Sequence, residues 1–543
     1  MSAIETQSNA LEAATGQPWW KGACIYQVYP RSYADSNGDG VGDLPGLTAH
    51  LDHIASLGVE GVWISPFFKS PMADFGYDVS DYCDVDPVFG TLEDFDQLIF
   101  KAHRLGLKIV IDQVYSHTSD EHDWFTQSRS DRTNDKADWY VWADPKPDGS
   151  PPNNWQSVFG GPAWSWDARR CQYYMHNFLS AQPQLNLHNR EVQQAILDVM
   201  AFWLDKGVDG IRLDAVSFMM HDRQLRDNPP RTAEPDRKLT RSFDFQRHEF
   251  NQSQPEIVEF LKRMRALTDS YGGRYLVAEV DREHAAREMK DYTEGEDRLQ
   301  TAYGFTYLYA DQLTPALVRQ ACEEWPGNPG EGWPSWTFSN HDAPRAVSRW
   351  SAGRDNDVFA RMSLLLLTCL RGNIFLYQGE ELGLPQADVA YEHLQDPEAI
   401  ANWPLTLGRD GARTPLPWQE NAPSQGFSSG QPWLPLDPRH KALSVDAQES
   451  KPDSVLHWAR RVLALRQASA ALRTGTLNFH SVPDPLLVFE RAAEGETILC
   501  AFNLGHERVN WALPAGWRKL EHVNPGLQDG GLEPLEAILA ERI

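Results

Sequence analysis

The sequence predicts an α/β fold: a (β/α)8 TIM barrel with a lid domain inserted after its third strand and an antiparallel β domain at its C-terminal end. Eight apolar runs alternate with helix-like spacers along the chain, which is the pattern of repeated βα units. The runs are nearly unbroken, as expected for parallel strands that are buried on both faces. Acidic residues follow several of these runs, where the carboxyl ends of barrel strands carry reactive groups.

The first three predicted strands lie near the N-terminus. They are CIYQVYPRS from Cys24, GVEGVWISPFF from Gly58 and LGLKIVIDQVYSH from Leu105. Two helix-like stretches, LPGLTAHLDHIASLG and TLEDFDQLIFKAHRLG, separate them. Strand, helix and strand therefore follow one another as the barrel requires.

The other five predicted strands follow after a long interval. They are GIRLDAV from Gly210, YLVAEV from Tyr275, an aromatic segment from Tyr303 to Leu308, PSWTFSNHD from Pro334 and NIFLYQGEE from Asn373. The same alternation with helical spacers continues between them, so the count reaches the eight strands of a closed barrel.

The chain of 543 residues exceeds the usual size of one domain, so additions to the barrel are expected. The interval after the third strand is rich in Trp, Pro and Asn, and the tail shows short alternating runs, LLVFERA and TILCAFNL, typical of antiparallel strands. The leader, at 1–17, is predicted to be disordered, and the barrel covers 18–117 and 182–472 with an irregular excursion around 385–435. The lid is inserted at 118–181, and the β domain follows at 473–543.

Composition excludes several classes of function. The formal net charge is −26, from 76 acids and 50 bases, which argues against a nucleic-acid or anionic-membrane partner. The longest apolar run, MSLLLLTCL, stops at Arg371 and predicts a core helix, while the leader lacks a secretory signal. Six cysteines are scattered without paired spacing, which predicts a reduced, cytoplasmic protein.

The fragment GIRLDAV carries the strongest chemical signal. It places Arg212 and Asp214 two residues apart on a short strand, so both side chains project from the same face. A carboxylate beside a permanently charged guanidinium is expected to titrate low and to stay ionised at neutral pH, as a nucleophile that attacks a sugar carbon must.

Two further acids follow other predicted strands. Glu279 ends the run LVAEV, and Asp342 stands beside His341 in FSNHDAPR. Each acid alone is more often an N-cap or a salt-bridge partner, but three acids at the ends of three strands of one barrel favour a catalytic constellation. The apolar neighbours of Glu279 are expected to raise its pKa, so that it holds a proton near neutrality.

Four short motifs give the chain a family resemblance. DQVYSH, GIRLDAV, VAEV and SNHD occur in the order and at the strand ends found in the α-amylase family of glycoside hydrolases, family 13. The chain most resembles the α-glucosidase and oligo-1,6-glucosidase branch of that family, over nearly its whole length. The resemblance implies three catalytic roles: Asp214 as the nucleophile, Glu279 as the general acid and base, and Asp342 as the carboxylate that stabilises the transition state.

The resemblance also implies a retaining reaction with a covalent glucosyl intermediate. Arg212, His117 and His341 match sugar-binding positions of the family, although an ordinary loop histidine is the alternative for His117. The expected partners are small α-glucosides and the water or hydroxyl acceptors that displace the enzyme. No pattern for an organic cofactor, zinc or a phosphate-binding loop is present.

Substrate preference is implied by three more positions. Asp78 in DFGYDVSDY and Arg413 in RDGARTPLPW match a charged pair that closes the pocket in related α-glucosidases, so cleavage is expected to release one terminal glucosyl unit. The alternative is that these two are separate surface charges. Ala215, directly after Asp214, accompanies α-1,4 cleavage in this branch, whereas valine accompanies α-1,6 cleavage. Maltose-like or aryl α-glucosides are the expected donors, with sucrose as a further candidate.

The loop DSNGDGVGD predicts an ion site. Its side-chain oxygens are spaced as ligands for Ca²⁺ or Mg²⁺, with Gly40 allowing a sharp turn. Gly46 stands where an EF-hand would need glutamate, so the loop is not an EF-hand. It resembles the ion-binding loop of oligo-1,6-glucosidases, and an ion here would be structural, unless the loop is a series of Asx turns with no ion. The predicted ligands are Asp35, Asn37, Asp39, Asp43 and, through the resemblance, the carbonyl of Val41.

Two residues depart from the family pattern. Ser116 stands where many relatives have asparagine before the histidine, which makes the calcium site of α-amylases doubtful here, and Gln184 stands where many have aspartate. In the lid, Trp155, Phe159 and Trp164 are candidates either for stacking on sugars or for packing the lid's own core.

Two alternative functions stay open at this point. One is a glucosyl isomerase or transferase, including a sucrose-using enzyme, which would use the same residues. The other is a non-catalytic subunit of the same fold that binds a partner protein, as in transporter heavy chains. The three acids favour an enzyme, and the sequence leaves the oligomeric state open.

Overall fold

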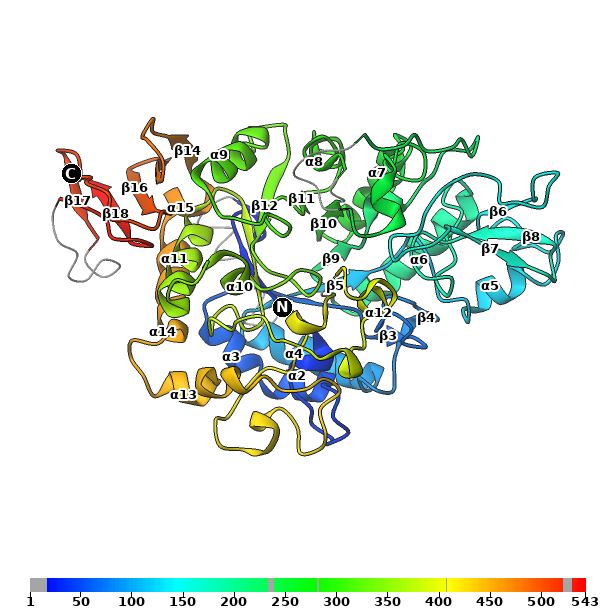
Figure 1. The fold of residues 1–543 in the computed structure, drawn as a ribbon, viewed down its shortest axis with the longest axis horizontal. Helices are drawn as coiled ribbons and strands as arrows, with labels where there is room; N and C mark the ends of the chain where they lie inside the picture. The colour runs from blue at the N-terminus through cyan, green and yellow to red at the C-terminus, as the bar shows by residue number, and fades with distance from the viewer. Residues whose placement is uncertain (1–16, 233–238, 281–282, 407, 521–529) are drawn as a thin grey trace.

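The computed structural model describes residues 17–232, 239–280, 283–406, 408–520 and 530–543. Residues 1–16 of the predicted leader lie outside these ranges. The described chain forms a central barrel with a lid at one end of the long axis and the C-terminal β domain at the other (Figure 1).

The predicted eight-stranded parallel barrel is confirmed. Its strands close in the order β1-β13-β12-β11-β10-β9-β5-β2, and most of their residues are buried, which explains the unbroken apolar runs. The strand bounds are β1 Cys24–Val28, β2 Gly61–Ile64, β5 Lys108–Gln113, β9 Gly210–Leu213, β10 Tyr275–Val280, β11 Thr301–Gly304, β12 Trp333–Thr337 and β13 Asn373–Tyr377.

The sixth barrel strand begins and ends earlier than predicted. Strand β11 spans Thr301–Gly304, whereas the sequence indicated Tyr303 to Leu308. Pairing with β10 stops where Val280 faces Gly304, so Phe305 already lies past the sheet edge. The aromatic residues that suggested a strand pack in the following turn instead, where the ring of Tyr307 contacts Trp336 and Phe338.

Helices surround the barrel and connect its strands. The predicted helix-like stretch that begins at Leu44 forms two helices that meet at His50, and the run that ends near Cys369 is a buried core helix, as predicted. The α-helix bounds are α2 Leu44–Ala49, α3 Leu51–Ser56, α4 Leu92–Arg104, α5 Asp123–Ser128, α6 Arg190–Asp205, α7 Ile257–Ser270, α8 Ala285–Thr293, α9 Pro315–Glu324, α10 Ala346–Trp350, α11 Asn356–Cys369, α12 Pro397–Asn402, α13 Val445–Glu449, α14 Val455–Ala468 and α15 Ala470–Thr474.

The lid has a small sheet and one short helix, α5. Strands β6 (Trp142–Ala143), β8 (Gln172–Met175) and β7 (Trp164–Asp167) pair in that order. A separate hairpin of β3 (Phe68–Lys69) and β4 (Asp81–Val85) extends the loop after β2. The lid therefore has its own secondary structure, although its sequence lacks helical periodicity.

The predicted antiparallel C-terminal domain is a five-stranded sheet in the order β14-β15-β16-β18-β17. Its alternating runs bury one set of side chains in a small core that includes Leu486, Leu499 and Ile538. The strand bounds are β14 Thr476–Phe479, β15 Leu486–Ala493, β16 Glu496–Asn503, β17 Trp517–Lys519 and β18 Ala537–Arg542.

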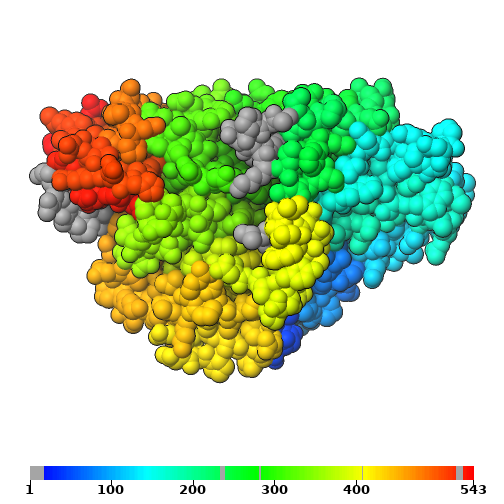
Figure 2. All heavy atoms as spheres, viewed as in Figure 1, coloured from blue at the N-terminus to red at the C-terminus, as the bar shows by residue number. Residues whose placement is uncertain are grey.

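The excursion predicted around 385–435 is irregular and Pro-rich in the structure too. It follows β13 and carries α12 and several 3-10 turns, and its yellow surface lies beside green segments of the barrel's second half in Figure 2. The 3-10 turns of the chain are η1 Pro30–Ser32, η2 Val216–Phe218, η3 Ser242–Phe245, η4 Tyr391–His393, η5 Asp410–Ala412, η6 Pro423–Gly426 and η7 Pro438–Leu443.

Two whole-chain expectations can be compared with the fold. All six cysteines are free thiols, as the scattered spacing predicted. Within the described ranges, none of the helices has the length and apolar character needed to cross a membrane.

One aromatic cluster anchors α6 to the barrel, and it generates a stability prediction. The Trp203 ring is fully buried against the rings of Phe67 and Phe95, at centroid distances of 5.5 Å and 5.0 Å. We expect Trp203→Ala to cost about 3–5 kcal/mol of barrel stability, because it leaves a cavity, and to lower the thermal unfolding midpoint. The matched control is Phe100→Ala on α4, a phenylalanine that is 64% exposed. An equal drop in both variants would contradict the assignment of this cluster as an anchor.

Candidate active site

The three predicted catalytic acids line one cavity of about 300 Å³ at the carboxyl ends of the barrel strands. Asp214 directly follows β9, Glu279 lies at the end of β10, and Asp342 lies in the loop after β12. A cavity of this size holds a small sugar. The barrel therefore brings together the constellation predicted from the sequence.

A buried guanidinium joins two of these acids to a third carboxylate beneath them. Arg212 Nη1 lies 2.6 Å from Asp214 Oδ1 and 2.7 Å from Asp112 Oδ1, and its Nη2 lies 2.6 Å from Glu279 Oε1. Arg212 is fully buried. A planar guanidinium offers several N–H donors in fixed directions, so one side chain can hold three carboxylates.

The strand register explains this arrangement. Arg212 on β9 faces Asp112 on β5 and Val277 on β10 as Cα partners. Side chains on one strand repeat their direction every two residues, so Asp214 and Glu279 share the face of Arg212 and Val277. Three neighbouring strands therefore deliver their charges to one point.

The pKa of Asp214 is raised to about 7, which contradicts the expectation that it would titrate low. Burial is the main cause, and the negative charges of Asp112 and Asp342 add to it, while Arg212 acts in the opposite direction. The expectation treated Arg212 as the partner of one acid, but three carboxylates share its charge.

The pKa of Glu279 is raised to about 7, in the predicted direction. Burial is again the main cause, and the charges of Asp214 and Asp342 contribute. Because the two acids interact closely, their protons belong to the pair, and near neutral pH the pair holds about one proton.

Asp342 has the opposite character. Burial alone would raise its pKa, but contact with the His341 ring and the positive charges of Arg413 and Arg409 hold the pKa well below its usual range. Arg413 Nη2 lies 2.7 Å from Asp342 Oδ1. This acid therefore stays ionised while the other two share a proton.

The two predicted sugar-binding histidines are buried, and each contacts Tyr77. His117 lines the cavity, its Nε2 lies 3.0 Å from the carbonyl of Tyr77, and burial lowers its pKa to about 4. His341 Nε2 contacts the Tyr77 hydroxyl, and burial lowers its pKa to about 3. Both rings are therefore neutral at pH 7.

The predicted closing pair of Asp78 and Arg413 does not form. Asp78 accepts hydrogen bonds from Ser70 Oγ and from the backbone N–H of Asp74, at 2.8 Å and 2.9 Å, and so stabilises a turn. Arg413 bonds Asp342 instead. The pair that lines the cavity is Asp74 with Arg409, at 2.8 Å.

Arg409 also binds Asp396 at 2.7 Å, which fixes the guanidinium at the cavity wall. Asp74 and Arg409 were not among the residues predicted from the sequence. Asp74 lies four residues before Asp78 in the motif DFGYD, and Arg409 lies four residues before Arg413 in the motif RDGAR. Each motif thus offered two candidates of the same type, and only the fold distinguishes them.

Ala215 has a strained backbone that aims an amide at Glu279. Its φ is 43°, in the left-handed region, and its N–H donates to Glu279 Oε2 at 3.1 Å. A second group missed from the sequence, Tyr303, donates its hydroxyl to Glu279 Oε1 at 3.2 Å. Tyr303 is the Cα partner of Glu279 on β11, so pairing of these two strands was the signal that could have found it.

The lid aromatics divide between the two alternatives. Phe159 lines the cavity, whereas Trp155 and Trp164 pack in the lid core. The two departures from the family pattern are also accommodated. Ser116 Oγ lies 2.9 Å from His117 Nδ1, and Gln184 Nε2 donates to the carbonyl of Phe218 at 2.7 Å.

The loop predicted to bind an ion forms Asx turns. Asp35 accepts the N–H of Gly38 at 2.7 Å, and Asp39 accepts the N–H of Val41 at 2.8 Å. Asp43 accepts the N–H of Gly46 at 2.6 Å and so caps α2. Among the described residues, no three His, Cys, Asp or Glu side chains converge to hold a metal, so an ion here would also need amide and carbonyl oxygens.

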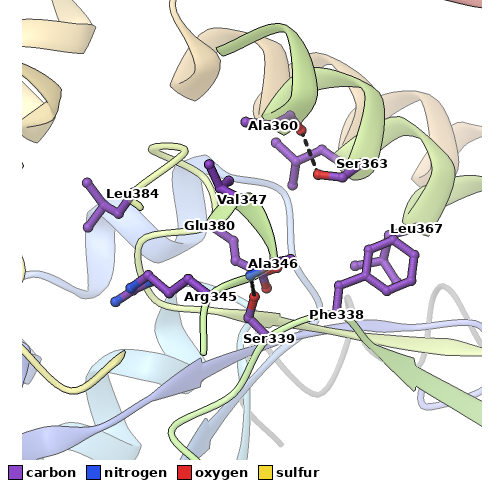
Figure 3. Close-up of a pocket in the computed structure, with 11 residues that line it drawn as sticks. Phe338, Ser339, Arg345, Ala346, Val347, Ala360, Ser363, Leu367, Glu380 and Leu384 are labelled. Atoms are coloured by element: carbon purple, nitrogen blue, oxygen red, sulfur yellow. Dashed lines mark hydrogen bonds between the residues drawn. The ribbon is translucent and has the colours of Figure 1, made fainter. Parts of the chain in front are cut away.

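A second, much smaller cavity lies beside the loop that carries Asp342. It has a volume of about 10 Å³ and lies behind Ser339, whose Oγ accepts the N–H of Ala346 at 3.0 Å (Figure 3). Glu380 points toward Ser339, whereas the guanidinium of Arg345 points away from it (Figure 3) and donates to the carbonyls of Gln378 and Ala412. This space fits about one water molecule, so it is not a substrate site.

The raised pKa of Glu279 generates a stability prediction. A carboxyl whose folded-state pKa is about 7, above an unfolded value of about 4.3, costs stability as the pH rises through that window. Glu279→Gln cannot ionise, so we expect its thermal unfolding midpoint to rise relative to the wild-type midpoint between pH 5 and pH 8. The matched control is the exposed Glu121→Gln. A midpoint difference that stays constant or falls with pH would contradict this electrostatic account.

Known proteins with similar sequences belong to the family that the motifs and the site indicate. A sequence model of the α-amylase catalytic domain matches residues 27–475. A probable α-glucosidase of Rhizobium meliloti (strain 1021) is 52% identical over 520 residues, covering 95% of this chain and 94% of the relative. An oligo-1,6-glucosidase of Heyndrickxia coagulans is 36% identical over 546 residues, covering 92% and 95%.

Solved structures include a close match too. The crystal structure of an α-glucosyl transfer enzyme, XgtA, has a TM-score of 0.94 and 52% sequence identity, and the match covers 97% of this chain and 100% of that one. The agreement extends over the barrel, the lid and the C-terminal domain, since nearly the whole of each chain is matched. The chain therefore belongs to the α-amylase family of glycoside hydrolases, in its α-glucosidase and oligo-1,6-glucosidase branch.

Proposed function

We propose that the protein is a retaining, exo-acting α-glucosidase that also transfers glucosyl units to hydroxyl acceptors. The observation that carries the proposal is the joining of Asp214 and Glu279 by one buried guanidinium, in a cavity that also holds Asp342. A retaining glycosidase needs one ionised and one protonated carboxyl across the scissile bond, and the shared proton of this pair meets that need.

In the first step, Asp214 attacks the anomeric carbon and Glu279 gives the shared proton to the glycosidic oxygen. The bond from this carbon to the leaving group breaks as the ester bond to Asp214 forms. Asp342 stays ionised and stabilises the positive charge that develops on the sugar. Arg212 keeps Asp214 in place.

In the second step, Glu279 removes a proton from water or another hydroxyl, whose oxygen attacks the anomeric carbon. The ester bond to Asp214 breaks, and the product keeps the α configuration. Ala215 N–H and the Tyr303 hydroxyl both donate to Glu279, so they stabilise its ionised form after the first step.

The exo mode is supported by the corrected charged pair. Asp74 and Arg409 lie at the cavity wall with His117 and Gln182, and these polar groups suit the hydroxyls of one terminal glucosyl unit. A chain that extended beyond this unit would meet the buried ion pair. Attack therefore releases one unit at a time.

The preference for α-1,4 bonds is supported by Ala215, which lines the cavity directly after the nucleophile. The proposed donors are maltose-like glucosides, with sucrose as a further candidate. The isomerase alternative is not favoured, because two relatives that are 52% identical to this chain are named as a probable α-glucosidase and as an α-glucosyl transfer enzyme, whereas a trehalulose synthase of the same fold is 30% identical. We also propose a cytoplasmic protein, on the evidence of six free thiols.

Product analysis tests this function. With maltose, isomaltose and sucrose as separate donors, we expect the fastest release of α-glucose from maltose, and Asp214→Asn should abolish turnover of all three because no ester can form. Time-resolved chromatography and NMR of the anomeric product provide the measurement. The matched control is Asp52→Asn, a carboxylate on α3 outside the cavity. Wild-type rates in Asp214→Asn, or release of β-glucose, would refute the mechanism.

We propose further that the loop of residues 35–43 binds Ca²⁺ or Mg²⁺ as a structural ion. The donor set fits a hard cation: carboxylates of Asp35, Asp39 and Asp43, the amide oxygen of Asn37 and the carbonyl of Val41. Asp35 and Asp43 lie close enough that the charge of Asp35 contributes to the raised pKa of Asp43, so a cation would relieve this repulsion. When bound, the ion would hold the loop and not take part in the reaction.

Chelation tests the ion site. We expect treatment with EDTA to lower the thermal unfolding midpoint more than it lowers turnover near room temperature, because the loop lies outside the cavity. Added Ca²⁺ or Mg²⁺ should restore the midpoint, and Asp39→Asn should weaken that response, whereas Asp52→Asn should not. An unchanged midpoint, together with no metal in elemental analysis, would favour the loop of Asx turns without an ion.

A further inference from the structure

We propose that Gln27 on β1 is a positioning residue that keeps the ring proton of His341 on Nε2 and so aims this N–H at Asp342. The inference deepens the proposed function and rests on it, because it adds a residue to the groups that hold the carboxylate assigned to the transition state. It follows from one set of hydrogen bonds in which each donor and acceptor can be identified.

Gln27 is fully buried near the carboxyl end of β1 and faces the inside of the barrel. Ile25, two residues earlier, packs with residues of other barrel strands, among them Trp63 on β2 and Tyr303 on β11. Side chains on a strand repeat their direction every two residues, so Gln27 shares this inward face. Its Nε2 lies 2.7 Å from Nδ1 of the His341 ring.

The ring of His341 is neutral and held in one orientation. Burial lowers the pKa of His341 to about 3, so at pH 7 only one of its nitrogens carries a hydrogen. The ring stacks on Tyr29, with centroids 5.6 Å apart and planes 21° apart, and meets Trp63 edge-on at 6.1 Å. Packing therefore fixes where the two nitrogens lie, and hydrogen bonds decide which of them is protonated.

The groups around Nε2 require the hydrogen on this nitrogen. The Tyr77 hydroxyl contacts Nε2 and donates its single hydrogen to Asp112 Oδ2 at 3.1 Å, so it accepts from the ring. Asp342 Oδ2 lies 3.1 Å from the same nitrogen. Because Asp342 stays ionised, it would repel a lone pair on Nε2, whereas it attracts an N–H.

The amide of Gln27 assigns the same tautomer from the other side of the ring. An amide nitrogen can only donate, so Gln27 Nε2 donates to the lone pair on Nδ1, and Ser65 Oγ accepts its second hydrogen at 3.4 Å. The reverse orientation of the amide would place an oxygen against Nδ1 and draw the hydrogen away from Asp342. A glutamate at this position would do the same, so the amide is what keeps the ring neutral with its hydrogen on Nε2.

This proton placement bears on catalysis through Asp342. The N–H of His341 holds Oδ2 of Asp342, and Arg413 Nη2 holds Oδ1 at 2.7 Å. A carboxylate that is fixed at both oxygens needs little rearrangement when positive charge develops on the sugar. Gln27 therefore influences the transition state through His341.

The tautomer is measured by NMR of the protein labelled with nitrogen-15 in its histidines. A protonated ring nitrogen and an unprotonated one resonate far apart, and the signals of His341 are those that disappear in His341→Gln. In the wild type at pH 7, we expect Nε2 to be protonated and Nδ1 to be unprotonated. A hydrogen on Nδ1, or on both nitrogens, would overturn the inference.

Two variants test whether Gln27 controls the ring. Gln27→Glu presents an acceptor to Nδ1, so we expect Nδ1 of His341 to become protonated and kcat to fall about tenfold or more with an aryl α-glucoside as donor. KM should change less than kcat, because the effect acts through Asp342 on the transition state. Gln27→Met removes the donor without adding an acceptor, and we expect a smaller fall in kcat, about threefold to tenfold.

The matched controls are Gln448→Glu and Gln448→Met. Gln448 is also a buried glutamine, 3% exposed, whose amide donates to the carbonyl of Leu382 at 2.9 Å, but it lies on α13, outside the cavity. Both controls should keep the wild-type tautomer of His341 and the wild-type kcat. Thermal unfolding of each variant checks that it is folded.

The inference and the proposed function fail in different ways. Absence of turnover by the wild type would refute the proposed function, whereas the NMR spectrum still decides the tautomer. Turnover with the hydrogen on Nδ1 would overturn this inference alone. A folded Gln27→Glu that leaves Nδ1 unprotonated would also overturn it, as would a wild-type kcat in Gln27→Met.

Discussion

The three contacts of the buried Arg212 guanidinium, with Asp112, Asp214 and Glu279, are the constraint on which the site depends. Without this charge, three carboxylates would be buried close together, which is too costly for all of them to ionise. With it, two of the three still have a pKa near 7, so the pair of Asp214 and Glu279 keeps one proton for catalysis. The same contacts fix the positions from which the two acids act.

The barrel produces this constraint through its register. Strands β5, β9 and β10 are neighbours, and their pairing places Asp112 and Arg212 opposite each other. A shift of one residue in any of these strands would turn the charged side chains to the other face. The surrounding loops then complete the cavity, and Asp74 and Arg409 bring a buried ion pair to its wall. Fold and chemistry therefore share one origin in strand placement.

Much of this architecture is predictable from the sequence, because buried parallel strands leave apolar runs that few other elements imitate. The sixth strand was misplaced, since aromatic residues suit both a strand and the turn that follows Gly304. The sequence favoured Asp78 and Arg413 as the closing pair, whereas Asp74 and Arg409, four residues earlier in each motif, form it. DFGYD offers two acids, and only contacts between distant segments decide which of them faces the cavity. The raised pKa of Asp214 was not predictable from the adjacent Arg212, because it depends on carboxylates from other strands.

The most direct test of the central claim is to trap the glucosyl enzyme. In the Glu279→Gln variant, Asp214 can still attack an activated donor such as α-glucosyl fluoride, because fluoride leaves without a proton. The variant cannot activate water for the second step, so the glucosyl enzyme should accumulate. We expect intact mass spectrometry to show one added glucosyl unit, and peptide mapping to place it on Asp214. An adduct on any other residue, or none while fluoride is released, would contradict the assignment of Asp214 and Glu279 as nucleophile and general acid and base.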